Sequence, residues 1–265
     1  MLITVVVTIR NERDHIRDLL DSLVTQEGPV EIIVVDAFSD DGTVELVEGY
    51  CRSHPQVRLL MRGGTRGEGR NFGIEAARGE VVAFIDGDCI ANAFWLKEIR
   101  KDMRAGKEIV AGRTVRIGKP EFARLSRVEL FYQGVDVTYP SCNLAYRTEI
   151  LRELGGFDTR FRTAEDIDLN YRAVHRGHRI HYNENAIVYH RERDSLVPFL
   201  KQAFWNGYGR KQLTLKHGAL WSNYSVSNML RRDMSFWYLI RSSVALLGYL
   251  TAKARERRED YIGDE

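Results

Sequence analysis

Two carboxylates, Asp86 and Asp88, flank Gly87 directly after the apolar run 81–85. The run is typical of a buried strand, and charge at the end of a buried strand is costly unless something offsets it. Mg²⁺ and Mn²⁺ offset it well, because they prefer oxygen ligands from one or two carboxylates together with substrate phosphates. The alternative is an ordinary strand-end turn, in which Asp and Gly are common. Alone the tripeptide favours the turn, but together with the motifs in the rest of the chain it predicts a site for Mg²⁺ or Mn²⁺.

A second group of acids, Glu165, Asp166 and Asp168, begins a helix predicted over about 164–176. The pattern that starts at Thr163 also fits a capping box, so helix capping is the alternative explanation. Three acids are more than capping requires. A carboxylate beside a metal-bound phosphate can act as a general base toward a hydroxyl group, and we predict that role for Asp166.

A histidine and an arginine complete the candidate chemistry. His190 ends a strand predicted near 178–190, and its imidazole suits Mn²⁺, although a packed histidine is the alternative. Arg70 follows the glycine-rich stretch 63–69, where a flexible loop feeding a helix is a plausible phosphate cradle. The first strand–helix turn, at 10–13, contains no glycine, which disfavours a dinucleotide-binding oxidoreductase.

These residues need a sheet to position them. Strands are predicted at 2–9, 30–36, 57–61, 80–86 and 109–115, and helices at 13–25, 43–54, 69–78, 93–105 and 148–154, with an irregular stretch before 140. Alternating strands and helices indicate an α/β fold, a parallel sheet with helices on both faces. Ligands bind such sheets at the carboxyl ends of the strands, so we expect Asp36 and Asp86 to share one cleft.

Length and composition indicate one large domain or one domain with an appendage. The 265 residues are 44% apolar and 29% charged, and we predict a main domain at 1–194 and a helical, basic segment at 195–265. Residues 195–258 carry eleven Lys and Arg against two acids, which indicates an anionic surface as partner, and no nucleic-acid partner is expected. Three cysteines without CxxC spacing indicate a reducing compartment and argue against a disulfide framework or a zinc site. The N-terminus has no signal-peptide pattern, so we expect a cytoplasmic location.

The basic segment also carries aromatic and apolar residues. Residues 234–252 are nearly long enough to span a bilayer, but Arg241 and basic flanks at both ends disfavour spanning. We predict helices that lie peripherally in the cytoplasmic membrane interface, and the alternative is a helical hairpin packed on the main domain or on a dimer partner. Arg210 and Lys211 either close over a diphosphate or form a solvated basic face.

Together the motifs resemble the large family 2 of inverting glycosyltransferases, which has the GT-A fold. Within residues 2–190 they follow the family's order: Thr8-Ile9-Arg10-Asn11-Glu12, Val34-Val35-Asp36, Asp41-Gly42-Thr43, Arg70-Asn71-Phe72-Gly73, Asp86-Gly87-Asp88, Asn143-Leu144-Ala145-Tyr146-Arg147, Gly155-Gly156-Phe157-Asp158, Glu165-Asp166-Ile167-Asp168-Leu169 and Val188-Tyr189-His190. One segment departs from the family pattern V-D-D-G-S, since Ala37 and Phe38 replace an acid and a turn glycine.

The resemblance implies a mostly parallel central sheet flanked by helices and a catalytic domain at 1–194. It implies that Asp166 is the catalytic base, that Asp88 and His190 bind Mg²⁺ or Mn²⁺, and that Glu165 lies on the acceptor side. The implied donor-binding residues are Thr8, Arg10, Glu12, Asp36, Arg70, Asp86, Asp88, Arg210 and Lys211. The donor would be a UDP- or GDP-linked sugar and the acceptor a lipid-linked or other membrane-proximal glycan, with inversion at the anomeric carbon.

Two other functions remain open from the sequence. A sugar nucleotidyltransferase also uses an α/β sheet and paired acids, but it usually has a glycine- and lysine-rich loop after its first strand, which this sequence lacks. A catalytically silent scaffold that binds a nucleotide sugar is the second. The presence of Asp86, Asp88, Asp166 and His190 together argues against it.

Overall fold

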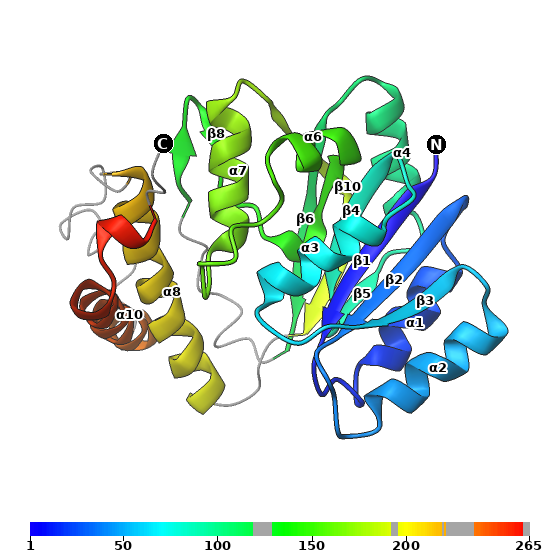
Figure 1. The fold of residues 1–265 in the computed structure, drawn as a ribbon, viewed down its shortest axis with the longest axis horizontal. Helices are drawn as coiled ribbons and strands as arrows, with labels where there is room; N and C mark the ends of the chain where they lie inside the picture. Colours follow the sequence, from blue (N-terminus) through cyan, green and yellow to red (C-terminus); the bar gives the residue numbers. More distant parts are fainter. Residues whose placement is uncertain (119–128, 192–195, 219, 221–235, 262–265) are drawn as a thin grey trace.

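The computed structural model describes the chain except for residues 119–128, 192–195, 219, 221–235 and 262–265. In the described part, an eight-stranded sheet of order β3-β2-β1-β4-β9-β6-β10-β5 forms the centre (Figure 1). Its strands are β1 Ile3–Ile9, β2 Val30–Asp36, β3 Val57–Met61, β4 Val81–Asp86, β5 Cys89–Ala91, β6 Ile109–Ile117, β9 Leu144–Arg147 and β10 Ile180–Arg191. The strands β7 Phe131–Tyr132 and β8 Val135–Asp136 pair separately.

The sheet is mixed in direction. Strands β1 to β4 are mutually parallel, as the sequence predicts, and β6 is parallel to β10. Strand β9 runs antiparallel to both β4 and β6, and β5 runs antiparallel to β10. The mostly parallel α/β architecture is therefore confirmed, while a purely parallel sheet is wrong at β9 and β5.

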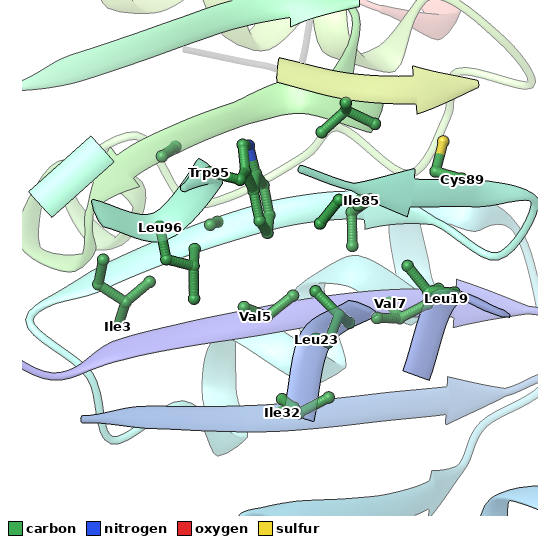
Figure 2. Packing of buried hydrophobic residues seen from close by; sticks show 14 of the residues in the cluster. Ile3, Val5, Val7, Leu19, Leu23, Ile32, Ile85, Cys89, Trp95 and Leu96 are labelled. Carbon is green, nitrogen blue, oxygen red and sulfur yellow. The ribbon is translucent and has the colours of Figure 1, made fainter. Parts of the chain in front are cut away.

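Helices cover both faces of the sheet. They are α1 Ile16–Val24, α2 Thr43–Ser53, α3 Arg66–Ala76, α4 Trp95–Arg104, α6 Thr148–Glu153 and α7 Glu165–His175. Helices α8 Leu196–His217 and α10 Phe236–Arg255 lie to one side of the sheet, beyond α7 (Figure 1). On one face Val5 and Val7 pack with Trp95 (Figure 2), and on the other Val6 packs in a cluster with Phe84. Strand β1 is central in the sheet, so its side chains are buried on both faces. This explains why its sequence is an uninterrupted apolar run.

Helix α3 begins earlier than its predicted start at residue 69. Thr65 caps it, because its hydroxyl accepts from the Glu68 N–H at 3.3 Å while the Glu68 carboxylate accepts from the Thr65 N–H at 2.6 Å. The prediction of a flexible loop through 63–69 is therefore wrong for its second half. Gly73 permits the close approach of α3 to β1, since a Cβ there would lie 2.5 Å from Val6 Cγ1.

Helices α8 and α10 form a pair in backbone contact. A Cβ at Gly207 would lie 1.7 Å from the carbonyl oxygen of Ala245, and one at Gly248 would lie 1.9 Å from that of Phe204. The predicted C-terminal helical segment is therefore confirmed. The boundary predicted at 194/195 and the basic pair at 231–232 lie outside the described residues. None of the described helices combines the length and apolar character needed to cross a bilayer.

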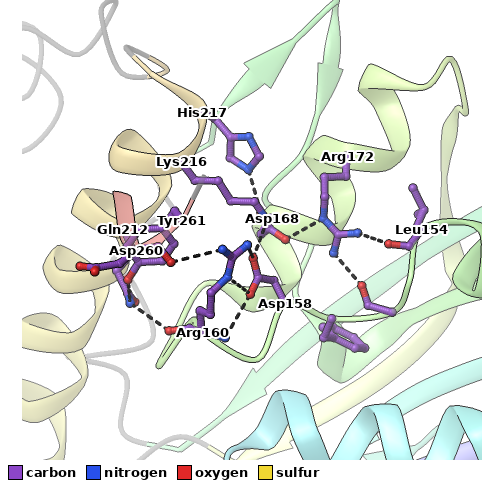
Figure 3. Close-up of polar contacts among 12 residues, drawn as sticks. Leu154, Asp158, Arg160, Asp168, Arg172, Gln212, Lys216, His217, Asp260 and Tyr261 are labelled. Carbon is purple, nitrogen blue, oxygen red and sulfur yellow. Dashed lines mark hydrogen bonds and ion pairs between the residues drawn. The ribbon is translucent and has the colours of Figure 1, made fainter. Parts of the chain in front are cut away.

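One buried carboxylate fastens α8 to α7 (Figure 3). Oδ1 of Asp168 accepts hydrogen bonds from Lys216 Nζ at 2.6 Å and pairs with His217 Nε2 at 2.7 Å, and Oδ2 accepts from Arg172 Nε at 2.8 Å. Burial alone would raise the pKa of Asp168, but the His217 hydrogen bond and the charges of Arg172 and Lys216 outweigh it and lower the pKa. Asp168 therefore serves to place α8, which explains one of the three acids at the start of α7.

Candidate active site

A cleft of about 880 Å³ opens where β4 ends, between the sheet, the start of α7 and the α8–α10 pair. Six of the predicted site residues line it: Asp86, Asp88, Glu165, Asp166, His190 and Arg210. Six others do not: Thr8, Arg10, Glu12, Asp36, Arg70 and Lys211. The structure thus brings the acids of two distant segments into one cavity and leaves part of the predicted donor-binding set outside it.

Asp86, Asp88 and His190 form a compact cluster. Asp88 Oδ1 lies 3.6 Å from His190 Nε2, and ligand atoms of all three residues lie within 4.8 Å of one another. The pairing of β5 with β10 sets His190 opposite Cys89, next to Asp88. Two carboxylate oxygens and one imidazole nitrogen suit Mn²⁺ or Mg²⁺, so the residues present fit such an ion. Asp86, which the resemblance places among the donor-binding residues, belongs to this set as well.

Gly87 allows the acidic turn to pack against β1. A Cβ at this position would lie 2.8 Å from Ile9 Cγ2 and 3.0 Å from Glu12 Cγ, closer than real side chains approach. Any larger residue would push the turn away from β1. The glycine between the two acids is therefore required by packing.

Arg70 links an acid at the end of β4 to an acid at the start of α7. It is buried, and it donates to Glu165 Oε1 at 2.6 Å and to Asp86 Oδ1 at 3.0 Å. Its guanidinium lies 5.4 Å from the centre of the Phe157 ring, and the Asn71 amide binds both the N–H and the C=O of Phe157 at 2.8 Å. The motifs at 70–73 and 155–158 thus act together to hold Arg70 in place.

The charge of Arg70 governs the ionisation of Asp86. Burial would raise the pKa of Asp86, but the charges of Arg70, Arg66 and His190 and the Arg70 hydrogen bond lower it below its ordinary value. Asp86 is therefore ionised at neutral pH, as a cation ligand must be. Glu165, expected on the acceptor side, is buried and paired with Arg70.

Asp166 is held by backbone donors at the first turn of α7. Its Oδ2 accepts from the Ser141 N–H at 3.1 Å and its Oδ1 from the Ile167 N–H at 2.9 Å. Burial and then the neighbouring Glu165 carboxylate raise the pKa of Asp166 to about 6, against the opposing charge of Arg70. The group is thus mostly ionised at neutral pH and still a better proton acceptor than an ordinary aspartate.

The capping alternative for this acidic segment is wrong. The N-cap residue of α7 is Ala164, which has a left-handed φ of 64° and makes no side-chain capping bond. Thr163 therefore does not form the capping box that its spacing to Asp166 suggests. The backbone instead turns sharply before α7, which brings Asp166 to the cleft and within reach of Ser141, a partner that the sequence analysis did not identify.

The remaining predicted donor-side residues lie at the ends of β1 and β2. Thr8 is in register with Asp86, and its buried Oγ1 has no hydrogen-bond partner in the described part of the chain. Asp36 is fully buried, and its carboxylate accepts from the Ser39 N–H at 2.6 Å and from the Ser39 hydroxyl at 2.8 Å. Arg10 is exposed just beyond β1. Asp36 and Asp86 therefore do not share this cleft.

Phe38 shows why the family has a glycine at this turn. Its φ is 58°, in the left-handed region that bulky residues avoid, and 62% of its surface is exposed. Its ring lies over Gly63, where a Cβ would come within 3.1 Å of it. The turn after β2 thus needs a positive φ, and this chain meets that need with a strained aromatic residue.

The two basic residues of α8 have different surroundings. Arg210 lines the cleft, whereas Lys211 Nζ lies 5.6 Å from the centre of the Tyr249 ring and helps to join α8 to α10. Other basic residues that line the cleft are Arg66, Arg113, Arg116, Arg162, Arg191, Lys201 and Arg241. The sequence analysis missed them because they come from separate segments, and only the fold places them around one cavity suited to phosphate groups.

Solved structures share this fold. The chain matches S. aureus TarS in complex with UDP-GlcNAc with a TM-score of 0.63 and 20% identity, covering 95% of this chain and 81% of that one. It also matches mannosyltransferase PcManGT from Pyrobaculum calidifontis, in complex with GDP-Man and Mn²⁺, with a TM-score of 0.63 and 19% identity. That match covers 99% of this chain and 76% of PcManGT. The fold is therefore the GT-A fold.

Curated relatives are similar over most of this chain. A pre-mycofactocin glycosyltransferase of Mycobacterium tuberculosis is 28% identical over 234 residues, 81% of this chain and 48% of its own length. Glycosyltransferase AglE of Haloferax volcanii is 26% identical over 230 residues, which cover 80% of this chain and 73% of that protein. This chain thus spans about half the length of the mycobacterial relative.

The family model described as glycosyl transferase family 2 matches residues 4–163, and one described as glycosyltransferase-like family 2 matches 128–209. With more than half of its length matched, the chain belongs to glycosyl transferase family 2.

Proposed function

We propose that the chain is an inverting glycosyltransferase that moves a sugar from a UDP- or GDP-linked donor to an acceptor hydroxyl. One observation carries the proposal: a single cleft holds the Asp86–Asp88–His190 cluster and also Asp166, whose pKa of about 6 suits a base at neutral pH. The donors named for the solved relatives, UDP-GlcNAc and GDP-Man, support a nucleotide sugar.

The residues divide the chemistry among them. Asp88 and His190, with Asp86, would hold Mg²⁺ or Mn²⁺, which when bound neutralises charge on the departing diphosphate. Arg66 and Arg210 line the same cleft and are placed to bind phosphate oxygens.

Asp166 takes the proton of the acceptor hydroxyl as the oxygen attacks the anomeric carbon. The Ser141 N–H keeps the carboxylate oriented for that transfer. Attack from the face opposite the leaving group is a single displacement, and it inverts the anomeric centre.

For the acceptor we propose a lipid-linked or membrane-proximal glycan, reached from the cytoplasmic face of a membrane. Helix α10 lines the cleft through Tyr238 and Arg241, and it also exposes an apolar row. The row is Leu239, Leu246, Leu247 and Leu250, each 41–58% exposed. Apolar residues beside basic ones suit an anionic lipid surface. Sedimentation with anionic vesicles should fall in Leu246→Asp, and equal sedimentation of that variant and the wild type would contradict the membrane proposal.

Donor binding and turnover test the central proposal together. We expect one UDP- or GDP-sugar to raise the melting temperature only with Mn²⁺, and Asp88→Ala to abolish that rise. Asp166→Asn should keep the donor-induced rise and lose turnover. Exposed Asp14, outside the cleft, provides the control Asp14→Asn, which should retain both.

The same assays separate the competing functions. Undiminished turnover in Asp166→Asn would refute its role as base. Donor binding without turnover in the wild type, across a broad acceptor panel, would favour a silent scaffold. Release of pyrophosphate from a nucleoside triphosphate and a sugar phosphate would favour a nucleotidyltransferase.

A further inference from the structure

Two buried thiols lie beside the imidazole of His190. Cys89 is fully buried, Cys142 is 5% exposed, and both are free cysteines. The sulfur atoms and one ring nitrogen of His190 all lie within 4.8 Å of one another. Cys89 and His190 are direct partners in the β5–β10 pairing, and Cys142 comes from the short helix that precedes β9. Three segments thus deliver two sulfur ligands and one nitrogen ligand to one point.

We propose that Cys89, Cys142 and His190 form a second metal site, selective for a thiophilic divalent ion such as Zn²⁺. Sulfur and imidazole are the usual ligands of Zn²⁺, whereas Mg²⁺ and Mn²⁺ prefer carboxylates. This site differs from the Asp86–Asp88–His190 cluster in its chemistry and shares only His190 with it.

The geometry is close to what Zn²⁺ requires. Tetrahedral Zn–S and Zn–N bonds place neighbouring ligand atoms about 3.5–3.8 Å apart, so shifts of about 1 Å complete the site. His190 is the member able to move, since 27% of its side chain is exposed. A water molecule supplies the fourth ligand, and Asp88 Oδ1, 3.8 Å from Cys89 Sγ and 3.6 Å from His190 Nε2, is near enough to accept a hydrogen bond from it.

Charge balance also favours Zn²⁺ at this site. Binding displaces one proton from each thiol to solvent, and the two thiolates then neutralise the Zn²⁺ charge while His190 binds as neutral imidazole. A neutral unit of this kind is tolerated beside the apolar cluster that contains Cys89 and Cys142. Without an ion, the same thiols pack as small apolar residues.

Both sites use His190, so only one of them can hold its imidazole at a time. When Zn²⁺ holds the imidazole, the Asp86–Asp88 pair loses its third ligand. Zn²⁺ should therefore weaken Mn²⁺ binding, and because the readout is metal binding, the site can be tested whether or not the chain transfers sugars.

Cobalt provides a direct test. Co²⁺ added to the reduced full chain should give a thiolate-to-cobalt absorption band in the near ultraviolet, which added Zn²⁺ removes. The band should be lost in Cys142→Ala and in the more isosteric Cys142→Ser, and Zn²⁺ affinity should fall at least about tenfold in both. Melting curves confirm that each variant is folded.

Two controls assign the ligands. Cys51→Ala removes the half-buried thiol of α2, and Asp86→Asn alters only the oxygen-rich cluster, so both should keep the band. No near-ultraviolet band on the wild type overturns the proposal. A band that survives in folded Cys142→Ala and Cys142→Ser, or one that is lost in Cys51→Ala, overturns it as well.

Discussion

The Ser141 N–H donates a 3.1 Å hydrogen bond to Oδ2 of Asp166, across 25 residues of sequence. This bond links the segment before β9 to the first turn of α7 and fixes the direction of the carboxylate. Burial and the adjacent Glu165 charge raise the pKa of that carboxylate to about 6. The hydrogen bond thus supplies orientation, and burial together with the Glu165 charge supplies basicity. Both have measurable consequences.

The first consequence is a pH dependence of turnover. Because only ionised Asp166 accepts a proton, kcat/KM should rise with pH and level off above an apparent pKa of about 6. The measurement is kcat/KM against pH at saturating metal. A rate that is constant between about pH 5 and 7 would show that another group is the base.

The second consequence is that Asp166→Asn should stabilise the protein. The pKa of Asp166 is higher in the folded than in the unfolded state, so ionisation costs folding free energy, and stability falls as pH rises between about 4 and 6. Asn cannot ionise and still accepts from Ser141. We expect a gain of about 1–2 kcal/mol in unfolding free energy at neutral pH, which vanishes near pH 4.

Urea unfolding at both pH values measures that gain. Asp14→Asn, in an exposed position, should change stability little and serves as the control. A loss of stability in Asp166→Asn at neutral pH would contradict the prediction.

Arg70→Met should be strongly destabilising. The substitution leaves Glu165 and Asp86 without their buried counter-charge, and breaking such a pair costs about 3–5 kcal/mol. Arg78→Met is the matched control, since Arg78 is 72% exposed and lies 3.9 Å from Glu31, a contact worth less than about 1 kcal/mol.

A double variant tests the cause of that loss. Adding Glu165→Gln to Arg70→Met removes one uncompensated charge and should recover part of the lost unfolding free energy in urea. Equal stability of the two single arginine variants would mean that the buried pair contributes no more than a surface pair.

Gly207→Ala should separate α8 from α10. The new Cβ would overlap the Ala245 carbonyl oxygen, so one helix must shift, and overpacking of this kind costs about 1–3 kcal/mol. At Gly49, inside α2, a Cβ would meet only the end of the Arg52 side chain, at 4.0 Å, so Gly49→Ala should raise stability by about 0.5–1 kcal/mol. Hydrogen exchange of α10 amides, faster in Gly207→Ala only, would confirm the site of the effect, and unchanged exchange would refute it.

The local sequence pattern was sufficient to predict much of the sheet. Strands β2 and β3 have the predicted bounds, because continuous apolar runs bounded by polar residues leave few alternatives. The start of α3 was missed because its glycines suggested a loop, whereas the cap at Thr65 and the close packing on Val6 favour helix. The direction of β9 was not predictable, since strand pairing is decided by distant segments.

Short-range patterning and motif order encode the family, the GT-A architecture and the acids that follow β4, so these could be predicted without a structure. Tertiary structure decided which residues meet. It placed Arg70 between Asp86 and Glu165, assigned Asp168 to holding α8, and left Asp36 outside the cleft. The physical reason is that charge and hydrogen-bond partners depend on distances between segments far apart in the chain, and folding alone sets those distances.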